Sequence, residues 1–411
     1  MVKYKQLANG VRLIVKQMTG LLSVSMGIIV GTGAAYESDS EDGISHFIEH
    51  MMFKGTKKRT AFQISDRMDA IGAQVNAFTS KDVTCYYAKS TSNHAEEAFE
   101  ILSDLFLNSV FPEDEMVREK GVVIEEISMN EDTPDDLCLD LLSQAFFGQK
   151  NYGRNILGSK QNVSGFTRED IKKYLNSRYT PDNIVISMAG NISFEQAEKM
   201  AEKYFEILPK NTLESRELNV QLSSSHLFKK KDIEQIHVAI AYPSFKRYER
   251  LCDATQIMNA VLGGSMSSRL FQTVREKLGL AYTVYSYVSC YEKSGALTVY
   301  AGVNAENFNK SVQAIAECIA ALKKKDMTED EFKRGKEQML SSLVFAQEST
   351  SSQMLVYGKE LLYSGKVFDF EERVSKLNAV TLNDVNEAIE CNFDERYKAS
   401  AVVGNVDKPL F

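Results

Sequence analysis

Two histidines and a glutamate lie close together in residues 43–53, which read GISHFIEHMMF. His46 and His50 are four residues apart, with Glu49 between them. On an α-helix, positions i and i+4 share one face and position i+3 lies beside them. Two imidazoles on one face can bind a metal ion, and a neighbouring carboxylate can take a proton from a metal-activated water. The spacing therefore predicts a zinc site with Glu49 as general base; a helix with two surface histidines is the simpler alternative.

A catalytic zinc ion needs a third protein ligand. A second predicted helix, at about 113–130, offers candidates in Glu119 and Glu126, which are seven residues apart. Seven residues make two helical turns, so these two carboxylates face the same way. One of them can bind the metal while the other supports a histidine. Spacing alone does not separate Glu126 from its neighbour Glu125, and a solvated helix face is the alternative for each glutamate.

The elements that must position these residues alternate between strands and helices. A β-rich segment at 22–31 precedes the histidine helix, and residues 74–90, which show alternation and include aromatic side chains, predict a strand or hairpin. Helical periodicity follows at 94–108, and a capping-box pattern opens a helix at 167–179. Residues 183–190 read as another strand. This order predicts a mixed fold of helices and strands.

The same order of elements then begins again in the second half. Residues 185–192 (VISMAGNI) resemble 399–406 (ASAVVGNV), and residues 113–118 resemble 329–334. We therefore predict an α+β fold of two homologous α/β domains, each a mixed, largely antiparallel sheet packed with helices. The expected parts are a zinc-binding domain at 1–212, a linker at 213–230 and a degenerate copy at 231–411.

The second copy lacks the candidate metal ligands. Aligned on the repeat, Glu119 falls on Gly335 and Glu126 falls on Ser342, and no histidine follows His237. Only the first copy is therefore expected to bind metal.

His46-Phe-Ile-Glu49-His50 followed by Glu126 resembles the pitrilysin/insulinase family, whose H-x-x-E-H motif defines the inverzincins. The chain is most similar to the small bacterial processing-protease branch and to the catalytic subunit of mitochondrial processing peptidase. The resemblance covers essentially the whole chain. It implies that His46, His50 and Glu126 bind zinc, that Glu119 supports the site, and that Glu49 acts on the water.

Two further groups of residues gain a role from this resemblance. Arg275 and Tyr282 can both donate to a carbonyl oxygen, and in the family the matching pair contacts substrate near the scissile bond. A surface arginine and a half-buried tyrosine are their ordinary alternative. Asn76, Ala77 and Phe78 match an edge strand that could bind an extended peptide by strand addition, with Asn76 holding the substrate backbone. An ordinary hairpin strand is the alternative there.

The family forms a clamshell of four such domains, and this chain has two. The resemblance therefore implies a second chain. We expect a homodimer in which Arg275 and Tyr282 complete the site of the partner; a mixed dimer with an inactive paralogue is the alternative.

Composition limits the function classes. The 411 residues carry a net charge of −8, which argues against a nucleic-acid partner, and no apolar run reaches membrane-spanning length. The first residues read as a strand and turn rather than a signal peptide, and the six cysteines form no C-x-x-C pair. We expect a cytoplasmic zinc metalloendopeptidase that acts on peptides or unstructured protein segments. The alternative is a non-catalytic peptide-binding or structural subunit of the same fold.

Overall fold

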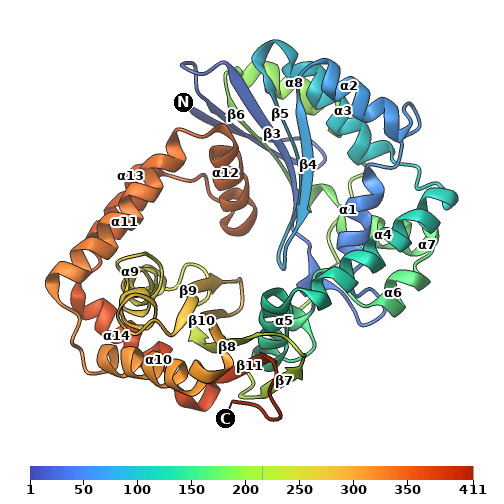
Figure 1. Ribbon diagram of the computed structural model, residues 1–411. Coiled ribbons are helices and arrows are strands. Elements are labelled where there is room, and N and C mark those ends of the chain that lie inside the picture. The colour runs from blue at the N-terminus through green and yellow to red at the C-terminus, as the bar shows by residue number, and fades with distance from the viewer. Residues whose placement is uncertain (215, 411) are drawn as a thin grey trace. The chain divides into compact units, whose positions relative to one another are not determined.

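The computed structural model describes residues 1–214 and 216–410, which form two compact units (Figure 1). Each unit holds one sheet packed with helices, so the predicted class, two mixed α/β domains, is confirmed. Unit 1 comprises Met1–Ile127, Asn155–Glu217 and Phe345–Asp369. Unit 2 comprises Ser128–Arg154, Leu218–Val344 and Phe370–Phe411.

Unit 1 is built on a six-stranded sheet in the order β1-β2-β6-β3-β5-β4. Strands β2 and β6 are parallel, and the other pairs are antiparallel. The strands are β1 (Val2–Gln6), β2 (Arg12–Gln17), β3 (Ser23–Val30), β4 (Gln74–Thr79), β5 (Thr84–Thr91) and β6 (Ile184–Gly190). β3 is buried on both faces, because its apolar side chains alternate between two layers of helices.

One face of this sheet carries the larger core. The helices that contribute side chains to this core are α1 (Ile44–Met52), α2 (Ala61–Ala70), α3 (Ala95–Asn108), the first part of α4 (Glu113–Asp132), α6 (Lys160–Gly165), α7 (Arg168–Arg178) and α8 (Phe194–Phe205). The opposite face is covered by α12 (Thr350–Ser364), which packs on β6 and β3 (Figure 1). Close approach of α12 depends on two glycines: a Cβ on Gly27 would lie 2.3 Å from Met354 Sδ, and one on Gly358 would lie 2.3 Å from Ile29 Cδ1.

Unit 2 is built on a five-stranded sheet in the order β7-β11-β8-β10-β9. The strands are β7 (His226–Lys230), β8 (Gln235–Ser244), β9 (Ala281–Cys290), β10 (Gly295–Asn304) and β11 (Ala399–Gly404). Its helices are α5 (Pro134–Phe147), α9 (Cys252–Leu262), α10 (Phe308–Lys323), α11 (Glu329–Gln347), α13 (Phe370–Ala379) and α14 (Leu382–Asn392), with a π-helical turn η5 (Phe271–Lys277). Helix α5 packs on β11 and β8 (Figure 1).

The two units exchange helices along the chain. α12 comes from the second half of the sequence but covers the unit 1 sheet, and α5 comes from the first half but covers the unit 2 sheet. The units therefore differ from the expected division into 1–212 and 231–411, and β7 begins inside the expected linker at 213–230. The physical reason is that each sheet has a second apolar face, which these helices bury.

Across residues 1–214 and 216–410, none of the helices combines the length and apolar character that a bilayer span requires.

Candidate metal centre

Helix α1 presents its two sides to different surroundings. Ile44, Phe47 and Ile48 are buried in the unit 1 core, which leaves His46 and His50 on a different side of the helix. The helix begins after Gly43, whose φ of 91° suits glycine, and a Cβ there would meet the Leu157 carbonyl oxygen at 2.7 Å.

A buried carboxylate holds the start of this helix. Glu37 accepts hydrogen bonds from the backbone N–H groups of Gly43 (2.8 Å) and Ser45 (2.9 Å), which an isolated helix end would leave unpaired. Burial raises the pKa of Glu37 to about 7, although the two N–H groups favour its charged form. The histidine helix is thus fixed at its N-terminus by a titratable group.

His46, His50 and Glu126 meet in space. Glu126 Oε2 lies 3.7 Å from His46 Nε2 and 3.5 Å from His50 Nε2, and one donor atom from each residue lies within 4.8 Å of the others. Zinc with bonds of about 2.0–2.1 Å in a tetrahedron places its ligand atoms about 3.4 Å apart. The donor set and its spacing therefore fit a zinc ion.

Burial favours the neutral form of His46, the form that can bind a metal ion. It lowers the pKa of His46 to about 4, with a further contribution from the charge of His50, so the ring is neutral at pH 7 and keeps a lone pair for a metal. Glu125, the alternative that spacing left open, is exposed and lies outside the cluster.

Glu119 connects the second histidine to a lysine. Its Oε1 lies 2.8 Å from His50 Nδ1, and its Oε2 accepts from Lys54 Nζ at 2.6 Å. Burial alone would raise the pKa of Glu119, but the hydrogen bonds with His50 and Lys54 outweigh it and lower the pKa. The ionised carboxylate can only accept, so His50 carries its proton on Nδ1 and offers Nε2 to the cluster.

The Glu49 carboxylate is held by a hydrogen bond from strand β4. The hydroxyl of Thr79, the last residue of β4, donates to Glu49 Oε2 at 2.5 Å. Burial raises the pKa of Glu49; the hydrogen bond from Thr79 and the charge of His50 act against this, while the charge of Glu126 adds to it. A carboxyl with a raised pKa is a better proton acceptor than a solvated one, as a general base requires.

Comparison with known proteins agrees with this geometry. Residues 13–160 match the family described as Insulinase (Peptidase family M16), and residues 165–339 match the Peptidase M16 inactive domain. The chain is 43% identical to the uncharacterized zinc protease YmxG of Bacillus subtilis, over the full length of both chains. It is 34% identical to an uncharacterized zinc protease of Rickettsia felis, covering 98% of this chain and 97% of that one.

This chain belongs to peptidase family M16. Solved structures share the fold at 20% identity. They include a protease from Helicobacter pylori, with a TM-score of 0.90 over 98% of this chain and 99% of that one. Another, titled as a peptidase M16 inactive domain from Pseudomonas fluorescens, has a TM-score of 0.92 over the full length of both chains.

The predicted substrate strand of this M16 chain lies at an edge of its sheet. Asn76, Ala77 and Phe78 belong to β4, which is the last strand and pairs with β5. The Asn76 side-chain oxygen accepts from the backbone N–H of Ala77 at 2.8 Å. Phe78 packs near Tyr87 and under the ammonium of Lys359, 5.1 Å from the ring centre. Position at an edge suits strand addition, whereas the Phe78 side chain already has protein partners.

Arg275 and Tyr282 belong to unit 2. Arg275 lies on the π-helical turn η5, with its guanidinium 5.2 Å from the ring centre of Tyr282 and 4.8 Å from that of Phe271. Tyr282 is the second residue of β9 and is 75% exposed. The pair is thus close together and partly open to solvent, and its contact with substrate stays a prediction.

Sequence reasoning missed Lys54 and Thr79. Lys54 lies two residues beyond the end of α1, so its nearness to the histidine helix could be expected, but its contact with Glu119 of α4 could not. Thr79 has no local signal, because its contact with Glu49 depends on how β4 packs against α1.

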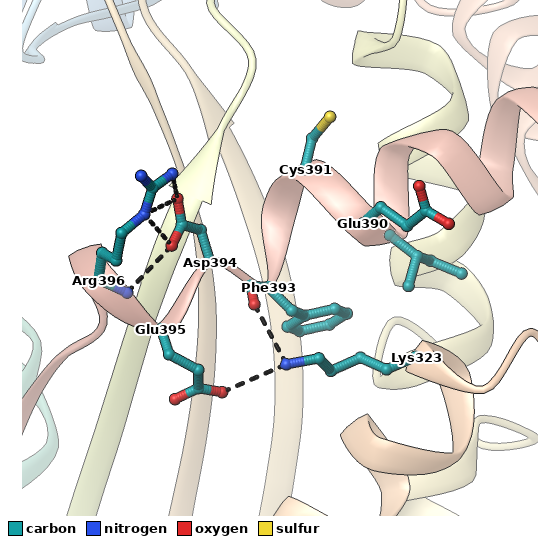
Figure 2. A pocket seen from close by; sticks show the side chains of 8 residues that line it. Lys323, Glu390, Cys391, Phe393, Asp394, Glu395 and Arg396 are labelled. Carbon is teal, nitrogen blue, oxygen red and sulfur yellow. Dashed lines mark hydrogen bonds and ion pairs between the residues drawn. The ribbon is translucent and has the colours of Figure 1, made fainter.

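A surface hollow of about 730 Å³ in unit 2 does not have the chemistry of a site. Its charged side chains are already in ion pairs: Arg396 bonds Asp394 at 2.6 Å and Lys323 lies 3.6 Å from Glu395 (Figure 2), while Glu390 pairs with Lys325 outside the hollow. Charges satisfied in this way leave little to recognise a ligand.

Proposed function

We propose that this chain is a zinc metalloendopeptidase that hydrolyses peptides or unstructured protein segments. The observation that carries the proposal is the convergence of His46 Nε2, His50 Nε2 and Glu126 Oε2, with Glu49 on the same helix as the two histidines. Membership of family M16 and the names of its zinc-protease relatives support it.

The protein side of the reaction follows from the contacts around the cluster. A bound zinc ion would supply a Lewis acid that polarises a peptide carbonyl and lowers the pKa of water. Glu119 orients His50 so that its Nε2 faces the metal position. Thr79 occupies Oε2 of Glu49, which leaves Oε1 to accept the proton of the attacking water and later deliver it to the leaving amine.

Substrate binding would use extended backbone. We propose that a peptide adds to the outer edge of β4, the terminal strand of its sheet, near Asn76, Ala77 and Phe78, and that Arg275 and Tyr282 contact its carbonyl groups. Recognition through the main chain tolerates many side chains, which suits a peptidase for unstructured segments.

Three measurements on purified protein test the activity: zinc per chain, cleavage of a fluorogenic peptide with and without chelator, and both again for Glu49→Gln. We expect one zinc per chain, loss of cleavage with chelator, and a variant that keeps its zinc but loses activity. A wild-type chain without zinc, or a Glu49→Gln variant that is fully active, would instead favour a non-catalytic peptide-binding or structural subunit.

We also propose that the active form is a homodimer in which Arg275 and Tyr282 complete the partner's site; a mixed dimer with an inactive paralogue is the alternative. Mixing a Glu49→Gln chain with an Arg275→Ala chain tests this. One hybrid site then has intact Glu49 and Arg275, so activity should return. Mixed chains that exchange subunits without recovering activity would contradict the arrangement.

For its compartment we propose the cytoplasm, since unpaired cysteines suit a reducing environment. Cell fractionation with an antibody tests this, and recovery from the medium would contradict it.

A further inference from the structure

Two thiols that are far apart in the sequence meet in unit 2. Cys252 is the first residue of α9, and Cys290 is the last residue of β9. Their sulfur atoms are 3.0 Å apart, and both side chains are partly exposed. No sequence motif marks this pair, because its members are not in C-x-x-C spacing.

The backbone on both sides of the pair is held in place. Cys290 pairs with Gly295 in the β9–β10 ladder, and its carbonyl accepts from Arg247 Nη2 at 3.2 Å. The N–H of Cys252 donates to the Glu249 carbonyl at 3.0 Å. A disulfide has an S–S length of about 2.05 Å, so bonding needs the sulfurs to approach by about 1 Å.

The surroundings favour a thiolate on one member. The hydrogen bond with Cys252 lowers the pKa of Cys290 and outweighs its burial, with further help from Gln256 and Arg247. The charge of Asp253 acts the other way, but both of its carboxylate oxygens bond the guanidinium of Arg373. The thiolate is the reactive form of cysteine.

The remaining four cysteines lack this combination. Burial raises the pKa of Cys85 to about 12, and it also raises the pKa values of Cys138 and Cys318. Cys391 is exposed, but within the described residues its sulfur is not hydrogen-bonded to a second thiol. Among the described residues, Cys252 and Cys290 therefore combine a short sulfur–sulfur distance with partial exposure to solvent.

We propose that Cys252 and Cys290 form a reversible oxidation site that hydrogen peroxide converts to an intramolecular disulfide. The Cys290 thiolate attacks one peroxide oxygen and breaks the O–O bond, which gives a sulfenic acid and hydroxide. The Cys252 sulfur then attacks the sulfenic sulfur, expels its oxygen as hydroxide and gives up its own proton. In total, two thiols and one peroxide yield one disulfide and two waters.

A peptide map of the full-length protein tests this. Reduced protein is treated with one equivalent of peroxide, alkylated under denaturing conditions and digested without reductant. We expect a cross-linked peptide that joins Cys252 to Cys290, loss of two of the six alkylatable thiols, and recovery of both with dithiothreitol. Cys391→Ser serves as the matched control and should give the same cross-link.

A wild-type map in which Cys252 and Cys290 are each alkylated, or are bonded to other cysteines, would overturn the proposal. So would conversion of Cys290 to a sulfinic acid with Cys252 still free. Because this result is read on the wild-type chain, it does not depend on whether a cysteine variant folds.

A thermal readout adds a second test. The disulfide would close a loop on the order of 40 residues, which restricts the unfolded chain. Peroxide should therefore raise the melting temperature of wild-type protein, in a manner that dithiothreitol reverses. Methionine sulfoxide is not reversed by dithiothreitol, so the reversible part isolates the disulfide. A reversible rise of the same size in Cys252→Ser would contradict the assignment.

Discussion

The two sheets of this chain have the same connections but different chemistry. Five strands of unit 1, in the order β2-β6-β3-β5-β4, match β7-β11-β8-β10-β9 of unit 2, each with one parallel pair followed by antiparallel pairs. Unit 1 adds β1 at its edge. The duplication that faint repeats indicated is therefore visible in the topology, and the difference lies in the helices.

The contrast is sharpest between α4 and α11. Both begin with Glu-Asp-Glu, but Glu119 of α4 reaches His50, whereas the aligned Gly335 of α11 packs against α9. A Cβ on Gly335 would lie 3.0 Å from the Ile257 carbonyl oxygen. Ser342, aligned with Glu126, donates to the Gln338 carbonyl of its own helix. At the position where unit 1 has Glu119 beside the candidate metal ligands, unit 2 has a helix–helix contact, so this fold does not require these carboxylates.

The largest expected difference between the units is in zinc content. Replacing Glu126 by Gln removes an anionic ligand, and we expect loss of zinc and a fall in peptide cleavage of about 10³-fold or more. Ser342→Ala, the matched change in unit 2, should keep one zinc and full activity. Metal analysis of both proteins checks this, with Glu125→Gln as a neighbouring control on α4. Zinc retained in Glu126→Gln would break the comparison.

A smaller effect on zinc binding is expected from changes to Glu119 and Lys54, which hold His50 in position. Glu119→Gln weakens the hold on His50 without removing a ligand, so zinc affinity should fall about 10–100-fold. Lys54→Met should act in the same direction by releasing Glu119 Oε2, and Lys54→Arg should restore most of the affinity. Competition with a chromogenic chelator measures all three. Equal affinities for Lys54→Met and wild type would show that Glu119 needs no second partner.

Much of the candidate metal centre could be predicted because its residues are close in sequence. Helical periodicity places His46, Glu49 and His50 together within one short helix, and it sets Glu119 two turns from Glu126. The choice of Glu126 over Glu125 needed the family resemblance, because neighbouring positions on a helix differ by only 100° of rotation.

The contacts that sequence reasoning missed are long-range. Thr79 of β4 donates a hydrogen bond to Glu49 of α1, and Cys252 of α9 contacts Cys290 of β9. Both contacts join a helix to a strand that is distant in sequence. The exchange of α5 and α12 was also missed. An apolar helix face shows that a helix must pack, but it does not identify the sheet that will receive it.

Packing in unit 2 gives the third prediction. Gly335→Ala places a methyl group 3.0 Å from a backbone oxygen, and we expect the free energy of unfolding to fall by about 1–2 kcal/mol. Gly121→Ala on α4 is the matched control, since a Cβ there meets nothing within 4 Å. Removing a helical glycine should raise stability by about 0.5–1 kcal/mol. Urea unfolding measures both, and equal changes would mean that α11 is not packed closely on α9.

The last prediction compares how α1 and α9, the helices that follow the matching strands β3 and β8, respond to pH. Helix α1 is held by the buried Glu37, whereas α9 carries Asp253 in a partly exposed ion pair with Arg373. With a pKa of about 7 when folded and 4.5 when unfolded, Glu37 keeps its proton in the folded state where the unfolded chain has lost it. The folded state therefore binds more protons between these values, and stability falls as pH rises from 4.5 to 7.

The expected slope is about 1 kcal/mol per pH unit between about pH 5 and 6.5, and Glu37→Gln should remove it. Unfolding in urea at several pH values, with chelator present so that zinc binding does not contribute, measures the slope for both proteins. The variant loses a carboxylate oxygen that accepts a backbone N–H, so it should also be less stable at low pH. Parallel curves for wild type and variant would show that Glu37 titrates alike in both states, and that its burial does not set the pH response of the histidine helix.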